Sequence, residues 1–108
     1  MNEGKVNWTG NFVAVITPFT KDGEIDEPKF LENIELMISE GVDGIVISGS
    51  NGESWALELD ERLRLFELGV EVVRGRVPVI GTSGMVLTKR VVELSAAARE
   101  VGCDGVMI

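Results

Sequence analysis

The 108-residue sequence contains no histidine, no tyrosine and only one cysteine, Cys103. Without histidine, the side chain that most often activates a serine or cysteine nucleophile near neutral pH is missing. One thiol cannot form an internal disulfide, and only carboxylates remain as metal ligands, without calcium-loop spacing. The sequence therefore predicts no metal and no cofactor, and it favours a packing role for Cys103 over a catalytic one.

Positive charge and long apolar runs are also scarce. The net charge is −8, the sequence pI is about 4.5, and lysine and arginine are not clustered as binding to nucleic acid requires. The first ten residues are polar where a signal peptide needs an apolar core, and no apolar run approaches the length of a membrane span. We therefore expect no nucleic-acid partner, no membrane partner and a cytoplasmic location.

Short apolar runs alternate with helical patterns along the chain. The runs are continuous and rich in β-branched residues, which is typical of parallel strands covered on both faces. Small or polar residues follow each of the first three runs. The pattern predicts strands at 12–16, 44–48, 77–80 and 104–108.

Three amphipathic helices are predicted between these strands. Asp26 and Pro28 favour the start of the first and Thr88 caps the third, whereas Glu58 is a poor cap and predicts a frayed or shifted start for the second. Gly41, Gly75 and Gly102 are expected to end the three helices. The inward stripes are Phe30, Leu31, Ile34, Met37 and Ile38; Leu59, Leu63, Phe66, Val70 and Val73; and Val91, Leu94, Ala98 and Val101.

An internal repeat indicates the architecture, because 41–47 and 102–108 share one pattern. The βα unit is about 30 residues, and eight such units make a (β/α)8 barrel of about 250 residues. We therefore predict one α/β domain over 1–108, with a tail at 1–10 and a (βα)3β segment that forms about the first half of a barrel. A flavodoxin-like doubly wound sheet is disfavoured, since no phosphate-binding glycine motif follows the first strand.

Parallel α/β folds bind ligands at the carboxyl ends of their strands. Small or polar residues occupy those ends, namely Thr17, 48–53 and 81–84. Ser50 and Asn51, flanked by Gly49 and Gly52, offer a hydroxyl, an amide and accessible backbone N–H groups, which suit a carboxylate. A plain polar turn is the alternative, and spacing alone leaves both interpretations open.

Five segments, in this order, resemble the dihydrodipicolinate synthase and N-acetylneuraminate lyase family: 15–19, 22–26, 41–44, 49–53 and 77–80. The resemblance extends from about Gly10 to Ile108. It implies a TIM barrel, no cofactor and a class I lyase in which a barrel lysine forms a Schiff base with pyruvate or another 2-oxo acid. Homo-oligomers, either dimers or tetramers, are also implied.

The resemblance also gives roles to residues of the GxxGE motif. Ser50 retains the hydroxyl that relays a proton or binds the carboxylate, whereas Asn51 stands where relatives usually have threonine. Asn51 can donate to a carboxylate but cannot copy a hydroxyl, which favours an aldolase for another 2-oxo acid over the synthase itself. Thr17 is expected at the barrel mouth, Trp55 either lines a pocket or covers the core, and Glu53 favours the following helix start over general-base chemistry.

No lysine of the sequence fits the Schiff-base role, which needs a dry position at the end of a strand. Lys5 lies in the tail, Lys21 in a turn, and Lys29 and Lys89 on polar helix faces. The resemblance places the reactive lysine and its tyrosine on later strands, after Ile108. We therefore expect weak oxo-acid binding without turnover; the alternative is a non-enzymatic half barrel that assembles with itself or a complementary chain through its unpaired strand edge.

Overall fold

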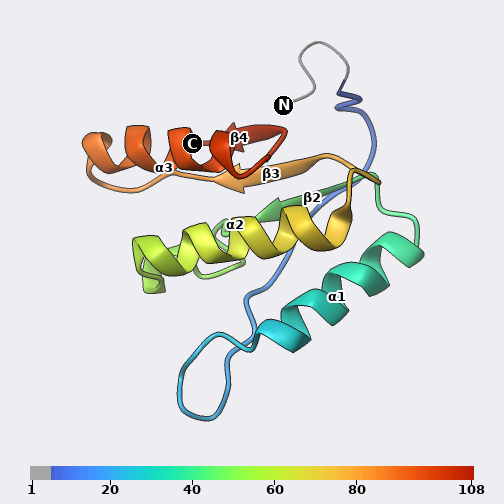
Figure 1. Cartoon of the computed structure of the whole chain (residues 1–108), viewed down its shortest axis with the longest axis horizontal. Coiled ribbons are helices and arrows are strands. Elements are labelled where there is room, and N and C mark those ends of the chain that lie inside the picture. Colours follow the sequence, from blue (N-terminus) through green and yellow to red (C-terminus); the bar gives the residue numbers. More distant parts are fainter. Residues whose placement is uncertain (1–5) are drawn as a thin grey trace.

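The computed structural model describes residues 6–108 and contains a parallel sheet with a helix between each pair of consecutive strands (Figure 1). Lys5 lies outside the described residues. A short 3₁₀ helix, η1, covers Ser54–Ala56 after the second strand. The elements in chain order are β1 (Phe12–Ala14), α1 (Glu27–Ser39), β2 (Gly44–Ile47), α2 (Leu59–Val73), β3 (Val79–Thr82), α3 (Thr88–Glu100) and β4 (Gly105–Met107).

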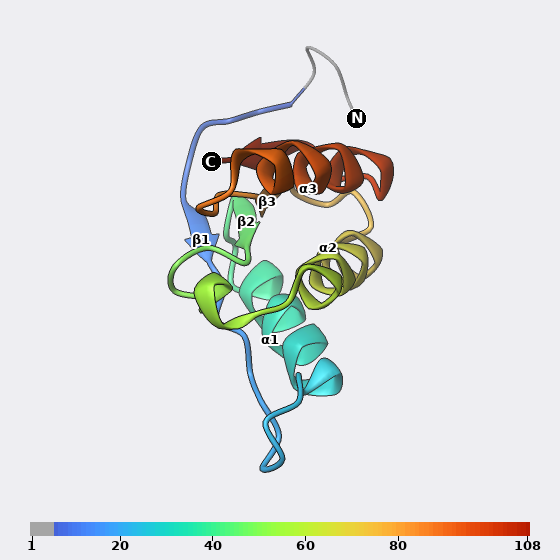
Figure 2. The same ribbon diagram turned by 90° about the vertical axis from the view of Figure 1, so that its left-hand side faces the viewer.

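The strands lie side by side in the order β1-β2-β3-β4, and every neighbouring pair is parallel. Figure 2 shows the helices gathered on one side of this sheet. A doubly wound sheet would reverse its strand order and carry helices on both faces. The predicted (βα)3β segment of a barrel wall is therefore confirmed, and the flavodoxin-like alternative is wrong.

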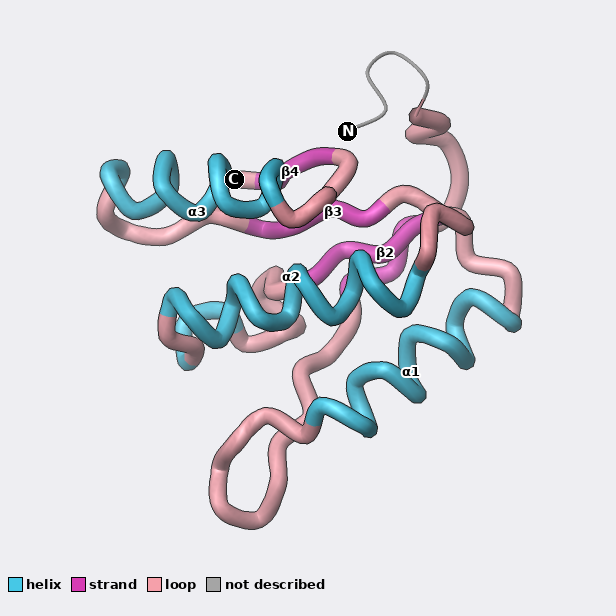
Figure 3. Tube along the Cα trace, in the orientation of Figure 1, coloured by secondary structure: helices cyan, strands magenta, loops and turns pink. Residues whose placement is uncertain are grey.

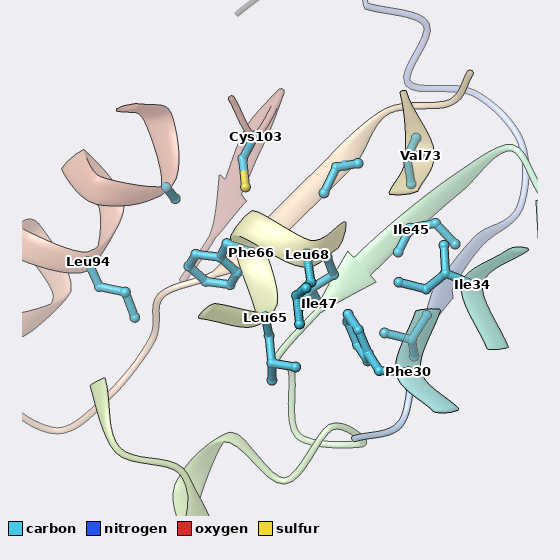
Figure 4. Close-up of a cluster of buried hydrophobic side chains, with 13 residues drawn as sticks. Phe30, Ile34, Ile45, Ile47, Leu65, Phe66, Leu68, Val73, Leu94 and Cys103 are labelled. Atoms are coloured by element: carbon cyan, nitrogen blue, oxygen red, sulfur yellow. The ribbon is translucent and has the colours of Figure 1, made fainter. Parts of the chain in front are cut away.

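The core lies between the sheet and the helices. Ile45 of β2 lies beside Ile34 of α1, and Ile47 lies between Phe30 of α1 and Phe66 of α2 (Figure 4). All five side chains are at most 1% exposed, and burying each contributes about 1.5–3 kcal/mol. The predicted stripes on α1 and α3 match this core. In α2, however, the predicted Leu59, Leu63 and Val70 are only partly buried, and the buried residues are Arg62, Leu65, Phe66, Leu68, Gly69 and Val73. The stripe predicted for α2 was therefore displaced around the helix.

Helix ends agree only partly with the predictions. The Asp26 carboxylate accepts from the Lys29 N–H at 3.1 Å, as expected of a cap, and Gly41 and Gly102 adopt left-handed backbone. Thr88 was predicted to cap the third helix but is its first helical residue. Leu87 occupies the cap position and makes no side-chain hydrogen bond there. The second helix ends at Val73 with Arg74 as its cap residue, and both Arg74 and the predicted Gly75 adopt left-handed backbone.

Glu58 does not fray the start of α2, contrary to the prediction. The helix begins at Leu59, and the carboxylate of Glu61 accepts from the backbone N–H of Glu58 at 2.8 Å. This bond satisfies a donor at the helix start and compensates for a poor cap residue.

Strand boundaries differ most at β3, which was predicted at 77–80. Pro78 lacks an N–H, and the ladder starts at Val79. At the other end, Gly81 and Thr82 belong to the strand because they continue the pairing with β4. A side chain at Gly81 would come within 3.0 Å of the Phe66 ring, so glycine here permits close packing rather than a loop.

β1, β2 and β4 are each shorter than predicted. Val15 still donates to the Val46 carbonyl at 3.0 Å just after β1. The segment between β1 and α1 forms a long loop that projects from the body (Figure 3). Its two arms meet through a bridge between Phe19 and Ile25.

The internal repeat has a physical counterpart at the amino ends of the strands. The Asp43 carboxylate accepts from the Asn11 N–H at 2.7 Å, and the Asp104 carboxylate accepts from the Val79 N–H at 2.9 Å. In each case the aspartate precedes a strand and binds the backbone of the strand beside it. The repeated aspartates therefore set the register of two neighbouring strand pairs.

The glycines that follow these aspartates lie under aromatic rings. A Cβ on Gly44 would be 2.4 Å from the Phe12 ring, and one on Gly105 would be 2.9 Å from the Trp8 indole. The Trp8 and Phe12 rings are 6.1 Å apart. Residues 6–10 of the predicted tail are thus partly packed against the sheet.

Two arginine–glutamate pairs join α1 to α2 and to the residues that follow α2. Arg64 binds both carboxylate oxygens of Glu27 at 3.0 Å, and Arg76 binds those of Glu35 at 2.8 and 2.7 Å. The hydrogen bonds from Arg64 hold the pKa of Glu27 below its usual value. Both pairs are solvent-accessible, so they contribute less to stability than the apolar core does.

Among residues 6–108, none of the helices combines the length and the apolar character that a membrane span requires.

Replacing Asp104 with alanine should lower the free energy of unfolding by about 1–3 kcal/mol, because the buried Val79 N–H loses its acceptor. Urea denaturation monitored by circular dichroism measures this change. Asp104→Asn keeps an acceptor oxygen and should lose less. Equal stability of the alanine and asparagine variants would contradict the assigned role of the carboxylate.

Candidate functional site

The candidate site lies at the carboxyl edge of the sheet, where the parallel strands end together. Thr17 follows β1, the loop 48–53 follows β2, and 82–84 closes β3. The Thr17 hydroxyl donates to the Gly52 carbonyl at 2.7 Å in a buried contact. A Cβ on Gly49 would lie 3.6 Å from the Thr82 hydroxyl. The loop after β2 is therefore anchored to the segment after β1 and lies close to the end of β3.

Backbone hydrogen bonds close this loop into a compact turn. The Gly49 carbonyl accepts from the N–H groups of Gly52 at 3.0 Å and Ser54 at 3.2 Å. Ser48 begins the turn with a φ of +62°, which is uncommon for a residue other than glycine and is often found at functional sites. These constraints fix the two residues at the tip, Ser50 and Asn51.

Ser50 and Asn51 are exposed, whereas the flanking Gly49 and Gly52 are buried. Neither tip side chain hydrogen-bonds another residue of the described part, 6–108. A free hydroxyl and a free amide can therefore donate to a bound oxygen. The structure brings together Thr17, Gly49, Ser50, Asn51 and Gly52, while their roles with a ligand remain predictions.

Three buried polar groups lie near this loop; the sequence placed Ser48 and Thr82 at the carboxyl edge of the sheet but did not single out Arg62. The Ser48 and Thr82 hydroxyls are buried without a hydrogen-bond partner in the described chain. Arg62 of α2 is 2% exposed, and burial lowers the pKa of its guanidinium. The apolar stripe predicted for α2 missed Arg62, because the buried face of this helix lies to one side of that stripe. No local pattern marks Arg62, since the carbonyl groups that it binds belong to Thr82 and Gly84.

Trp55 lines a cavity of about 480 Å³ beside the site. Arg62 and Leu87 lie on other walls of this cavity, and its lining does not include Ser50 or Asn51. The indole is 77% exposed, so it does not cover the core. The pocket interpretation of Trp55 therefore fits the geometry, but the cavity is separate from the loop tip.

Glu53 lies at the cap position of η1 in a left-handed conformation, without a side-chain capping bond. It therefore stands at the start of this short 3₁₀ helix and not at the start of α2, where the prediction placed it, and it makes no capping contact.

The other candidate nucleophiles are poorly placed. Lys21 lies in the β1–α1 loop, Lys29 pairs with Glu32 on α1, and Lys89 is in the first turn of α3; all three are exposed and off the strands. Burial raises the pKa of the Cys103 thiol to about 12, which keeps it protonated. Over residues 6–108, no group of three potential metal ligands is close enough to hold an ion.

Parallel strands with all helices on one face and a small polar loop at the carboxyl edge define the wall of a (β/α)8 barrel, a fold whose active sites lie at this edge. A family model described as the dihydrodipicolinate synthetase family matches residues 7–108. The chain therefore belongs to this family of lyases, as the five sequence segments indicated.

Related proteins agree with this assignment. A 4-hydroxy-tetrahydrodipicolinate synthase of Syntrophus aciditrophicus is 46% identical over 99 residues, covering 92% of this chain and 34% of that protein. Dihydrodipicolinate synthase from Aquifex aeolicus is similar at a TM-score of 0.89 and 38% identity, over 92% of this chain and 33% of its own.

YagE from E. coli K12, a prophage protein of the dihydrodipicolinic acid synthase family solved in complex with pyruvate, gives a TM-score of 0.89 at 36% identity. The match covers 92% of this chain and 33% of YagE. The chain thus spans about a third of the length of the relatives it matches, and it corresponds to their N-terminal portion.

Thr17→Val should lower the free energy of unfolding by about 1–3 kcal/mol, because the buried Gly52 carbonyl loses its donor. Hydrogen exchange at the loop amides should accelerate as well. Thr17→Ser retains the hydroxyl and is the matched control. If valine left both the stability and the loop exchange unchanged, Thr17 would not anchor the loop.

Proposed function

We propose that this chain is the N-terminal part of a class I lyase that acts on pyruvate or another 2-oxo acid through a Schiff base. In this segment, Ser50 and Asn51 hold the oxo-acid carboxylate, and Ser50 also relays a proton. Gly49 and Gly52 bring backbone N–H groups to the site, and Thr17 fixes the turn. We further propose that the protein works in the cytoplasm as a homo-oligomer.

The observation that carries this proposal is the free hydroxyl–amide pair of Ser50 and Asn51 on a loop anchored at the carboxyl edge. A carboxylate bound there would accept hydrogen bonds that are charge-assisted and therefore stronger than neutral ones. The pyruvate complex of YagE supports a 2-oxo acid as the ligand class. The acidic character of the chain makes such local donors necessary for an anionic substrate.

The identity of Asn51 bears on the second substrate. An amide donates to a carboxylate but does not combine donation and acceptance at one atom, as a hydroxyl does. We therefore propose that the enzyme is an aldolase acting on another 2-oxo acid rather than the synthase itself.

The amine that attacks the keto carbon lies outside this segment in our proposal. A Schiff base forms when an unprotonated lysine amine adds to the keto carbon and water leaves, which requires a dry site. Lys21, Lys29 and Lys89 are all exposed. By itself, the 108-residue chain is therefore expected to bind an oxo acid weakly and not to turn it over.

Borohydride trapping with pyruvate tests this division of roles. We expect no reduced adduct on the 108-residue chain, and an adduct at a lysine after Ile108 in any longer product of the same gene, as read by mass spectrometry. An adduct at Lys21, Lys29 or Lys89 would overturn the proposed absence of the amine. Failure of both products to react would overturn the lyase proposal.

The same assay tests the loop. In the longer product, Ser50→Ala or Asn51→Ala should reduce trapping at limiting pyruvate by about fivefold, since each removes a hydrogen bond to a charged group. Lys89→Ala is the control, and its trapping should equal that of the unaltered protein. Undiminished trapping in both loop variants would remove the loop from the carboxylate site.

A second candidate function is a non-enzymatic half barrel that assembles with itself or with a complementary chain. Strands β1 and β4 each have only one hydrogen-bonded neighbour within the described residues. Ile16 and Met107, near the ends of these strands, are 56% and 46% exposed. Unpaired edges and exposed apolar side chains favour association.

Sedimentation equilibrium distinguishes this candidate. The 108-residue chain should self-associate at micromolar concentration if its edges pair, and Met107→Lys should weaken that association. A strictly monomeric chain that also fails to bind a complementary fragment would rule this candidate out.

A further inference from the structure

Arg62 is a buried cation without an acidic partner. It lies near the start of α2, and no carboxylate of residues 6–108 forms an ion pair with it. A buried charge without a counter-ion is costly, so its other contacts must compensate. Those contacts are with the backbone of one segment.

The guanidinium binds the chain at the end of β3. Nη1 donates to the Gly84 carbonyl at 3.2 Å, and Nη2 donates to the Thr82 carbonyl. The planar fork of arginine reaches both oxygens at once, which a lysine ammonium cannot match in geometry. Arg62 therefore fixes the segment 82–84 at two points.

Thr82 in turn lies beside the loop that carries the candidate ligand donors. Its hydroxyl is buried without a hydrogen-bond partner in the described chain, and a Cβ on Gly49 would lie 3.6 Å from it. Because glycine has no Cβ, this distance places the hydroxyl beside Gly49 but is not a contact; the sheet pairing of Gly81 with Ile47 holds the two segments side by side. The Gly49 carbonyl closes the turn by accepting from the N–H groups of Gly52 and Ser54.

We propose that Arg62 is a positioning residue for the oxo-acid site, acting through Thr82 and Gly49 on the turn that presents Ser50 and Asn51. The identity of the ligand rests on the proposed function. The positioning role itself does not, because it concerns the loop before any ligand binds. Arg62 touches no reacting atom in this scheme, and its effect is to limit the motion of the loop.

Amide hydrogen exchange on the 108-residue chain tests the positioning role without a ligand. Arg62→Met removes both bonds, so exchange at the Gly52 and Ser54 amides should accelerate by about three- to thirtyfold. Arg62→Lys should give an intermediate rate. Arg64→Met is the matched control, because it breaks the exposed pair with Glu27 on the same helix and should leave the two loop amides unchanged.

Either of two results would overturn the proposal: loop exchange in Arg62→Met no faster than in Arg64→Met, or faster exchange spread evenly over all strands. If Arg62→Met does not fold, Arg62→Lys provides the same comparison against Arg64→Lys.

A double-mutant cycle tests the route through Thr82. Thr82→Ala removes the hydroxyl that faces Gly49 but keeps the carbonyl that Arg62 binds, so it should also speed exchange at Gly52. If Arg62 acts through Thr82, the combined variant should exchange no faster than the faster single variant. Fully additive effects would overturn this route.

Titration with pyruvate, followed through the amide signals of 49–52, connects the loop to the ligand. We expect Arg62→Met to weaken pyruvate binding at least about threefold and Arg64→Met to leave it unchanged. A loosened loop with unchanged affinity would overturn the link to the site. If the unaltered chain gives no response to pyruvate, the proposed function fails for this segment, while the exchange rates still decide the positioning role.

Discussion

The parallel register of the four strands is the constraint on which the rest of the structure depends. Because each strand runs in the same direction, Thr17, the loop after β2 and the end of β3 all reach one edge. The aspartates at the opposite edge, Asp43 and Asp104, bind the backbone of the neighbouring strand and hold that register. A slip of one residue would exchange the inward and outward faces and separate the polar groups of the site.

Most of the fold could be predicted from the sequence, because buried residues recur with the period of the helix or strand that carries them. Phe30 and Ile34 mark the inward face of α1, and Ile45 and Ile47 are buried positions of β2. Boundaries were less predictable because they depend on contacts distant in sequence. β3 extends to Thr82 only because β4 lies beside it. The start of α2 is different, because Glu61 caps it from three residues away and was a local signal that the sequence reasoning missed.

The candidate site was predictable in location but incomplete in composition. Ser50 and Asn51 could be identified because small residues between glycines after a strand indicate a loop at the binding edge. Arg62 could not, since a charged residue on a helix usually faces water. Its burial depends on two carbonyl groups about twenty residues later in the chain, and no local pattern encodes that contact.

The two tryptophans are the only indole groups of the chain, and they lie in very different surroundings. Trp8 rests on Gly105 near the amino ends of the strands, whereas Trp55 stands largely in solvent after the loop at the opposite edge. Each indole therefore gives an intrinsic optical signal for one end of the sheet. Emission from Trp8 reports the docking of the N-terminal segment, and emission from Trp55 is open to quenching by solutes that reach the ligand-binding side.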